Sequence, residues 1–350
     1  MPSRRHHAKT TTGCYACKAR RVKCDEGRPA CKSCTRRHTT CQYPFDQGPG
    51  TPQHPRPPHG QDAAIAGGTP HVFDSLDLLL MHRYCTNTSS RLLPSPEATY
   101  VWQMVVPLKA ETHPILQRAI LALAAIDLAA SHAKAPGDST LSARYRARGL
   151  HHQQVALPMF QEMLTRQDPA QNNVIFMFSI MLIMLAFGAL QSTCEPPTVE
   201  DILEVFALFR GPRALWNIRD TAETELGEAI MSGDKLEVAS SDLITSGAEE
   251  IFAELDKTEM DEVCTEAAQL LRITWATVKL VPNDLRAMAY FPAMADDAFF
   301  TKVAEHDANA LLVLRHFAVV LKAHEERWWV GRWHEILVAA VDAAWPKDVQ

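Results

Sequence analysis

The first residues of the chain, MPSRRHHAKTTTGC, lack the apolar stretch that a secretory signal peptide requires. We therefore expect an intracellular protein, in which cysteines stay reduced and structural disulfides are rare. The sequence also lacks the residue patterns of a nucleophile elbow, a phosphate-binding loop, an HExxH site or paired catalytic carboxylates. These absences argue against a secreted, disulfide-bonded protein and against an enzyme.

Large apolar side chains are almost missing from residues 14–41, where Tyr15 and Val22 stand nearly alone. A segment with so little to bury cannot stabilise a hydrophobic core of its own. The same segment holds six cysteines with the spacing C-x2-C-x6-C-x6-C-x2-C-x6-C, so that one Cys-x2-Cys-x6-Cys unit occurs twice, 17 residues apart. The six are Cys14, Cys17, Cys24, Cys31, Cys34 and Cys41. Metal binding can supply the folding energy that apolar burial does not.

Zinc is the metal that thiolates at this spacing favour, because each Cys-x2-Cys pair can place two sulfurs on one ion. Six thiolates supply two tetrahedral sites only if two sulfurs bridge the ions. The pseudo-symmetry of the repeat makes its first cysteines, Cys14 and Cys31, the natural bridging pair. A disulfide knot or two unrelated Cys-x2-Cys motifs are the alternatives, and the complete duplication of the unit argues against both.

Acidic residues are scarce near the N-terminus, although the whole chain has a net charge of −6. Residues 1–45 hold 11 Lys and Arg against 2 acidic residues, a net charge of +9, which leaves −15 for the remainder. Six thiolates with two Zn²⁺ ions bring the segment to about +7. So basic a compact unit predicts contact with phosphate groups.

The stretch GCYACKARRVKCDEGRPACKSCTRRHTTCQY resembles the fungal binuclear zinc cluster DNA-binding domain over its whole length, including Pro29 in the loop that joins the two halves. The resemblance implies two zinc ions that are bridged by Cys14 and Cys31. It further implies that Cys17 and Cys24 complete one site and that Cys34 and Cys41 complete the other.

Four cations follow the second cysteine closely, at Lys18, Arg20, Arg21 and Lys23. On a short helix after Cys17 they can meet backbone phosphates and base edges in the major groove. The resemblance implies that Arg20 and especially Arg21 contact the bases of a CGG-type triplet. Lys18 and Lys23 would then contact phosphates, which position a protein without specifying sequence. The equivalent stretch of the second unit is Thr35 to Thr40, which contains Arg36 and Arg37. We expect it to play a supporting role by contacting the DNA backbone.

Residues 46–71 are rich in Pro and Gly and predict a flexible tether. No heptad pattern of a coiled coil occurs between Cys41 and His71. Two alternatives stay open. The protein binds single triplets as a monomer, or it forms a homodimer through its C-terminal domain.

Helical periodicity dominates residues 72–350, and no run alternates as a strand would. The fold class is therefore a small metal-stabilised binuclear zinc cluster domain (1–45), a flexible linker (46–71) and an all-α helical regulatory domain (72–350). The expected helices are Val72–Cys85, Glu97–Leu108, Pro114–His132, Ser139–Leu164, Asn173–Gln191, Val199–Phe209, Arg213–Met231, Glu259–Leu280, Phe299–Lys322 and Glu325–Trp345.

Segments such as LLLMHRYCTNTSSRL and ERWWVGRWHEIL resemble the C-terminal domain of fungal sterol uptake control regulators, which implies an apolar pocket that can hold a sterol. The most apolar helix, residues 174–190, could line it with Met177, Met181 and Met184. We favour a core helix that is buried on all sides. A membrane span is the weaker alternative, because basic flanks and a second comparable segment are missing.

Other residues show no ligand spacing. We expect His151 and His152, which have no partner motif, to be exposed. We expect free thiols at Cys85, Cys194 and Cys264. Packing anchors are expected at Trp328, Trp329 and Trp333.

The sequence as a whole predicts a nuclear, sequence-specific transcription regulator that binds double-stranded DNA, acts with the transcription machinery and holds two zinc ions. It would control a metabolic pathway or a biosynthetic gene cluster. The alternative is a regulator of sterol genes that responds to an apolar small molecule such as a sterol.

Overall fold

The computed structural model describes residues 14–20, 22–41, 43, 73–93, 96–133, 139–193, 195–212, 251–282 and 284–346. The chain divides into two compact units, Met1–Pro70 and His71–Gln350. All regular secondary structure within the described ranges is helical. The predicted fold class, a metal-binding cluster followed by an all-α part, is confirmed in this respect.

The N-terminal unit contains two short helices, α1 (Tyr15–Ala19) and α2 (Lys32–Thr35). Its buried core consists of Cys14, Cys17, Cys24, Cys31, Cys34 and Tyr43. No aliphatic side chain among the described residues of this unit is buried. Sulfur atoms thus occupy the place of a hydrophobic core, as the scarcity of apolar residues predicts.

The second unit opens with α3 (Ser75–Arg83), which continues through a π-helical turn (Tyr84–Thr88) and a 3-10 turn (Ser89–Arg91). A capping box starts α3. The Asp74 carboxylate accepts from the backbone N–H groups of Leu76 and Asp77, and the Asp77 carboxylate accepts from the backbone N–H of Asp74. The next helical stretch comprises α4 (Pro96–Tyr100), a π-helical segment (Val101–Val105) and α5 (Val106–Ala110).

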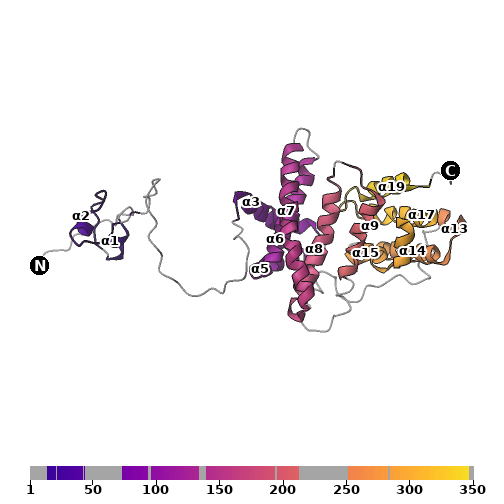
Figure 1. Ribbon diagram of the computed structural model, residues 1–350, viewed down its shortest axis with the longest axis horizontal. Coiled ribbons are helices and arrows are strands. Elements are labelled where there is room, and N and C mark those ends of the chain that lie inside the picture. The colour runs from indigo at the N-terminus through magenta and orange to yellow at the C-terminus, as the bar shows by residue number, and fades with distance from the viewer. Residues whose placement is uncertain are drawn as a thin grey trace. The chain divides into compact units, whose positions relative to one another are not determined.

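Three long helices form the middle of this unit, α6 (Pro114–Ala133), α7 (Ser139–Arg166) and α8 (Asn172–Leu190). Figure 1 shows α6 and α7 side by side, with α8 next to them. Gly149 allows the close approach of α7 to α6, since a Cβ atom there would lie 3.0 Å from Ile126 Cδ1. Met177, Met181 and Met184 of α8 are fully buried. The prediction of a core helix is therefore confirmed.

Two helical stretches, Pro114–Ala133 and Pro169–Leu190, are long and apolar enough to cross a membrane, with mean hydropathies of 1.4 and 2.3. The expectation that residues 174–190 have no comparable counterpart was therefore wrong. In both cases 72% of the apolar window is buried inside the helical unit. Burial against neighbouring helices accounts for their apolar composition.

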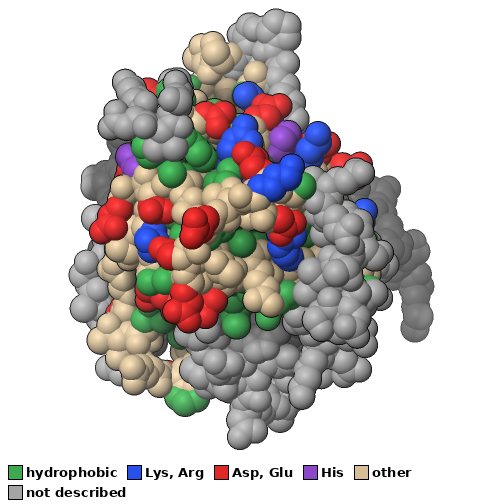
Figure 2. All heavy atoms as spheres, turned by 90° about the vertical axis from the view of Figure 1, so that its right-hand side faces the viewer, with side chains coloured by type: hydrophobic (Ala, Val, Ile, Leu, Met, Phe, Trp, Pro, Cys, Tyr) green, Lys and Arg blue, Asp and Glu red, His purple; other side chains and the backbone are tan. Residues whose placement is uncertain are grey.

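The remaining helices lie on the side of α8 that faces away from α6 (Figure 1). They are α9 (Val199–Ala207), α13 (Ala253–Lys257), α14 (Glu262–Leu280), α15 (Leu285–Met294), α16 (Asp297–Ala304), α17 (Ala308–His316), α18 (Ala318–Lys322) and α19 (Trp333–Ala344). Acidic and basic side chains are intermixed on this end of the unit, as Figure 2 shows. Surface ion pairs such as Arg315–Asp342 belong to this pattern.

Several predicted helix boundaries were wrong. The single helix expected over Phe299–Lys322 is divided among α16, α17 and α18, because His306 has a positive φ of 59° and Asp307 caps α17. The helix expected from Glu325 begins only at Trp333, after turns that include Gly331 with a φ of +42°. Helix α15 was not predicted. The helix expected over Arg213–Met231 lies outside the described residues.

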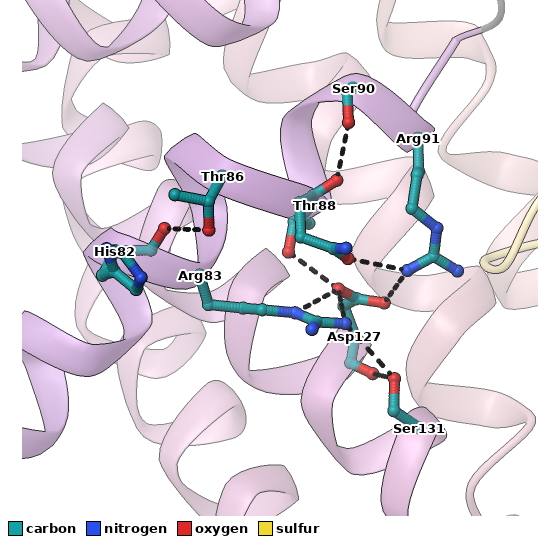
Figure 3. Close-up of polar contacts among 9 residues, drawn as sticks. His82, Arg83, Thr86, Thr88, Ser90, Arg91, Asp127 and Ser131 are labelled. Carbon is teal, nitrogen blue, oxygen red and sulfur yellow. Dashed lines mark hydrogen bonds and ion pairs between the residues drawn. The ribbon is translucent and has the colours of Figure 1, made fainter.

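A buried carboxylate holds the first turns of the unit against α6 (Figure 3). Asp127 is 1% exposed, and its Oδ2 accepts from Thr88 Oγ1 at 2.8 Å and from Arg83 Nε at 3.0 Å. Its Oδ1 accepts from Arg91 Nη1 at 3.0 Å. These three donors come from α3 and the two turns that follow it, so one side chain fixes the path of the chain there.

A second network of buried and partly buried hydrogen bonds joins α3, α6 and α7. Arg148 donates to both carboxylate oxygens of Asp77, at 2.9 and 2.6 Å, and His152 Nε2 lies 2.9 Å from Asp77 Oδ1. His152 is fully buried, so the expectation that it is exposed was wrong. Its partners Asp77 and Arg118 are 75 and 34 residues away in sequence, too far for a motif search to find.

Candidate metal centre and basic surface

The six cysteines of the repeat form two overlapping groups of four. Cys14, Cys17, Cys24 and Cys31 make the first group, and Cys14, Cys31, Cys34 and Cys41 make the second. Within each group all sulfur atoms lie within 4.8 Å of one another. The structure thus brings all six predicted ligands together, and the two cysteines common to both groups are the pair expected to bridge.

Distances between the sulfurs suit zinc. Cys14 Sγ lies 3.8 Å from Cys31 Sγ and 3.7 Å from Cys34 Sγ, and Cys17 Sγ lies 3.6 Å from Cys31 Sγ. Four sulfurs placed tetrahedrally at zinc's usual bond length are about 3.8 Å apart. A disulfide would need roughly 2 Å. The donor set therefore fits two zinc ions, each with four thiolates and no position left for water.

The duplicated sequence produces duplicated geometry. Cys14 and Cys31 each precede a short helix with nearly the same backbone angles, φ of −60° and −67° and ψ of 154° and 150°. The backbone N–H of each first cysteine points to the sulfur of the third, Cys14 N to Cys24 Sγ at 3.5 Å and Cys31 N to Cys41 Sγ at 3.3 Å. This contact between the first and third cysteines is therefore repeated in the two halves.

These contacts divide the thiols into two kinds. Burial raises the pKa of Cys24, but hydrogen bonds from backbone N–H groups outweigh it and lower the pKa to about 7. The backbone N–H of Cys31 likewise lowers the pKa of Cys41. Burial dominates at the shared pair instead, so that the pKa of Cys14 is raised to about 12 and that of Cys31 is raised further. Of these four sulfurs, the shared pair therefore gains more from the positive charge of metal ions than Cys24 and Cys41 do.

Two residues that the sequence reasoning missed connect the halves. The Asp25 carboxylate accepts from the Lys32 backbone N–H at 3.0 Å, which caps the start of α2 from the first unit. Tyr43 donates its hydroxyl to the Gly27 carbonyl at 3.0 Å and lies 3.7 Å from Cys24 Sγ. The local signal was weak, since a single Asp after a cysteine and a Tyr after the last cysteine form no motif.

The predicted DNA-contacting residues do not share one helix. Helix α1 ends at Ala19, because the backbone N–H of Val22 reaches back to the Cys17 carbonyl at 3.1 Å. Of the three cations that the structure describes, Lys18 lies within α1, Arg20 is its C-terminal cap and Lys23 lies in the irregular segment that follows. The side chains of Lys18 and Lys23 are exposed. The expectation of a helix after Cys17 that carries all four was wrong.

The two arginines of this stretch differ. Arg20 turns toward the cluster, since its Nε donates to the Ala16 carbonyl at 3.1 Å and its Nη2 lies 3.8 Å from Cys34 Sγ. Arg21 lies outside the described residues. In the second half, Arg36 and Arg37 follow α2 and are exposed, so they are available for contact with a nucleic acid backbone.

The helical unit contains a cleft of about 360 Å³ between the start of α6 and the end of α7. It is lined by Thr112, His113, Pro114, Ile115, Met159, Glu162, Met163, Arg166, Asp168 and Gln171. None of the three α8 methionines that were expected to line a pocket belongs to it. The predicted sterol pocket along α8 therefore stays a prediction.

Comparison with known proteins gives two domain matches. Residues 12–48 match the fungal Zn(2)-Cys(6) binuclear cluster domain, and residues 78–202 match the fungal specific transcription factor domain. The second match runs from within α3 to the start of α9, and it contains the Asp127 network and the α6 and α7 members of the second network, while Asp77 lies just before it.

Individual relatives agree with these matches. The chain is 29% identical over 221 residues to the Zn(2)-C6 fungal-type transcription factor afumD of Aspergillus fumigatus, which covers 60% of this chain and 55% of that protein. It is 29% identical over 196 residues to a Zn(2)-C6 fungal-type transcription factor of Gibberella zeae, over 40% of this chain and 39% of the relative. The chain thus spans about half or less of these curated relatives.

A third relative resembles the cluster alone. Sterol uptake control protein 2 of Saccharomyces cerevisiae is 58% identical over 40 residues, which are 11% of this chain and 4% of that protein. This likeness concerns the N-terminal cluster and not the helical unit. The chain thus carries a match to a cluster domain that binds two zinc ions, at the six cysteines that the structure brings together, and a second match to the fungal specific transcription factor domain.

Proposed function

We propose that this protein is a nuclear transcription regulator that recognises double-stranded DNA through its zinc cluster. The observation that carries the proposal is a compact six-sulfur unit with exposed cations, Lys18 and Lys23 in the first half and Arg36 and Arg37 in the second. Residues 1–45 would bind DNA, residues 46–71 would tether them, and residues 72–350 would act on the transcription machinery. The domain matches support this division of labour.

The proposed target is a CGG-type triplet. Arginine suits guanine because its guanidinium can donate to O6 and N7 together. Of the two arginines after Cys17, Arg20 has its Nε and Nη2 directed at the protein, which leaves Arg21 as the proposed base-contacting residue. Lys18 and Lys23, both exposed, would contact phosphates.

Titrations of the purified zinc-loaded chain against matched and mismatched duplexes test the proposal. Arg21→Ala should abolish the preference for the matched triplet, a loss of about 1–3 kcal/mol of discrimination. Lys23→Ala should weaken binding to both duplexes alike and should reduce the salt dependence. Lys322→Ala, at an exposed lysine of the helical unit, is the matched control and should change neither quantity. Equal losses on both duplexes for Arg21→Ala and Lys23→Ala would contradict the proposed roles.

The genes under control form the second half of the proposal. We infer regulation of a metabolic pathway or a biosynthetic gene cluster rather than of sterol genes. The likeness to a sterol uptake control protein is confined to the cluster, and the methionines of α8 pack in the core. Genome-wide occupancy of the tagged protein distinguishes these two kinds of target gene. Peaks over one contiguous set of biosynthetic genes would support control of a gene cluster, and peaks scattered over sterol genes would support control of sterol genes.

Pairing of two chains would have to use the helical unit, since residues 42–70 contain no heptad pattern. We propose such a homodimer on targets with two triplets. Analytical ultracentrifugation of the full chain, alone and with duplexes that carry one or two triplets, measures the stoichiometry. One chain per duplex on both targets would show that single triplets are bound by monomers.

A further inference from the structure

The side chain of Arg20 occupies an unusual position for a cation in a DNA-binding unit. It is the C-terminal cap residue of α1, and it is only partly exposed, whereas Lys18 and Lys23 on either side of it are exposed. Its Nε donates to the Ala16 carbonyl at 3.1 Å, one turn back along α1. Its Nη2 reaches across to Cys34 Sγ at 3.8 Å, in the other half of the repeat. The guanidinium thus spans from the first helix to a sulfur of the second metal group.

Two other sulfurs of that metal group obtain their donors from the backbone. The N–H of Cys34 points to Cys31 Sγ at 3.4 Å, and the N–H of Cys31 points to Cys41 Sγ at 3.3 Å. For Cys34, the N–H donor found in the described part of the chain is the guanidinium of Arg20.

A donor matters at this sulfur because Cys34 is fully buried and carries negative charge as a zinc ligand. A hydrogen bond from a cation to an anion is roughly twice as strong as a neutral one. Groups that orient a metal ligand typically change metal affinity by about 10- to 100-fold when they are removed. The guanidinium also neutralises part of the excess charge that six thiolates leave around two ions.

We propose that Arg20 is a positioning residue of the zinc cluster, which holds the Cys34 thiolate and ties the two halves together, and that it does not read a base. This inference goes beyond the proposed function, because it concerns metal retention. It differs from what resemblance to the family implies, namely base contact by both arginines. A base contact by Arg20 would require its guanidinium to leave Ala16 and Cys34.

The repeat itself supplies a matched control. Arg37 stands 17 residues after Arg20, at the equivalent place three residues after the second cysteine of its unit. Its side chain is exposed. Arg37→Ala removes the same cation from the same repeat position without removing a neighbour of a sulfur.

Zinc transfer from the full chain to a chromophoric chelator is the decisive measurement. In the absence of DNA, Arg20→Ala should release zinc about 10-fold faster than the unsubstituted protein. Arg37→Ala should release zinc at the unsubstituted rate, and Arg20→Lys, which can make one of the two contacts, should fall between them. Release from Arg20→Ala at the unsubstituted rate would overturn the proposal. If Arg20→Ala cannot be purified with two zinc ions, Arg20→Lys and Arg20→Gln give the same comparison.

Binding to matched and mismatched duplexes supplies the second readout. The zinc-loaded Arg20→Ala protein should keep the ratio of the two affinities, because no base contact is lost. Collapse of this ratio with unchanged zinc release would identify Arg20 as a base-reading residue. Should the unsubstituted protein itself show no triplet preference, the proposed function fails, while zinc release still decides the role of Arg20.

Discussion

At the scale of single residues, Asp127 shows how much one buried charge can organise. Its carboxylate is buried on α6 and accepts hydrogen bonds from Arg83, Thr88 and Arg91 (Figure 3). We expect Asp127→Asn to lower the free energy of unfolding of the helical unit by roughly 2–4 kcal/mol, because two arginines lose their anionic acceptor and the new amide brings an N–H group toward other donors. Urea unfolding followed by circular dichroism measures the loss.

The control for this prediction removes a carboxylate from an exposed pair. Glu162 pairs with Arg166 on α7, and both side chains are more than half exposed. Glu162→Gln should change the free energy of unfolding by less than about 0.5 kcal/mol, because water competes for both partners. Equal effects of the two substitutions would mean that burial adds nothing to the Asp127 contacts.

A functional residue could be predicted from the sequence when the pattern that marks it lies within a short stretch of the chain. The six cysteines follow from a repeated spacing that lies within 28 residues, so their convergence into two groups was predictable. Asp25, Tyr43 and the inward turn of Arg20 were not, because each depends on which atoms of the other half come near after folding. The fully buried His152 was missed for the same reason, since its partners lie on α3 and α6.

At the scale of helices, the contact of α7 with α3 and α6 should make stability depend on pH. His152 Nδ1 faces the donor Arg118 Nη1 at 3.2 Å, so this nitrogen accepts, and the N–H on Nε2 donates to Asp77. The ring is therefore neutral when the helices are packed. Burial lowers the pKa of His152 to about 4, although Asp77 acts in the opposite direction.

The sign of the effect follows from which state binds the proton. In the unfolded chain His152 titrates near its ordinary pKa of about 6.5, so between pH 6.5 and 4 only the unfolded chain takes up a proton there. Stability is complete above about pH 6.5 and falls as the pH drops toward 4, by up to about 3 kcal/mol. Burial also lowers the pKa of His324, to about 3, so this group adds a loss of the same sign.

Urea unfolding at pH 7 and pH 5 measures this dependence. His152→Gln should flatten it without abolishing it, because His324 still titrates. Replacing the neighbouring, only partly buried His151 by Gln is the matched control and should leave the difference between the two pH values unchanged. An undiminished pH dependence in His152→Gln would show that the buried ring does not contribute.

Helices α6, α7 and α8 were predicted almost to the residue because helical periodicity runs through the whole length of each. Helices α6 and α8 bury most of their residues, whereas α7 buries Gly149, His152 and Ala156. The short helices after residue 284 were not, since their boundaries depend on caps. Asp284, Asp296 and Asp307 each accept from a backbone N–H at the start of α15, α16 and α17. The sequence alone does not show that an Asp at such a position ends one helix and starts another.

At the scale of the whole molecule, the two units have cores of different chemistry, cysteine sulfurs in the first and apolar side chains in the second. We therefore expect them to unfold separately. The N-terminal unit buries sulfurs and one tyrosine, so its folding depends on metal. The helical unit buries a continuous apolar core that runs from Leu80 to Val341 and uses no metal ligand of the cluster. Removal of zinc should therefore unfold the first unit and leave the second intact.

Circular dichroism and DNA titration, each with a strong chelator, test this independence. The helical signal and the thermal midpoint of the second unit should stay unchanged, because α1 and α2 contribute only 5 and 4 residues. DNA binding should be lost, and it should return when zinc is restored. Loss of most of the helical signal with the metal would contradict separate units. It would mean that the cluster, beyond presenting cations to DNA, also stabilises the core around α6 and α8.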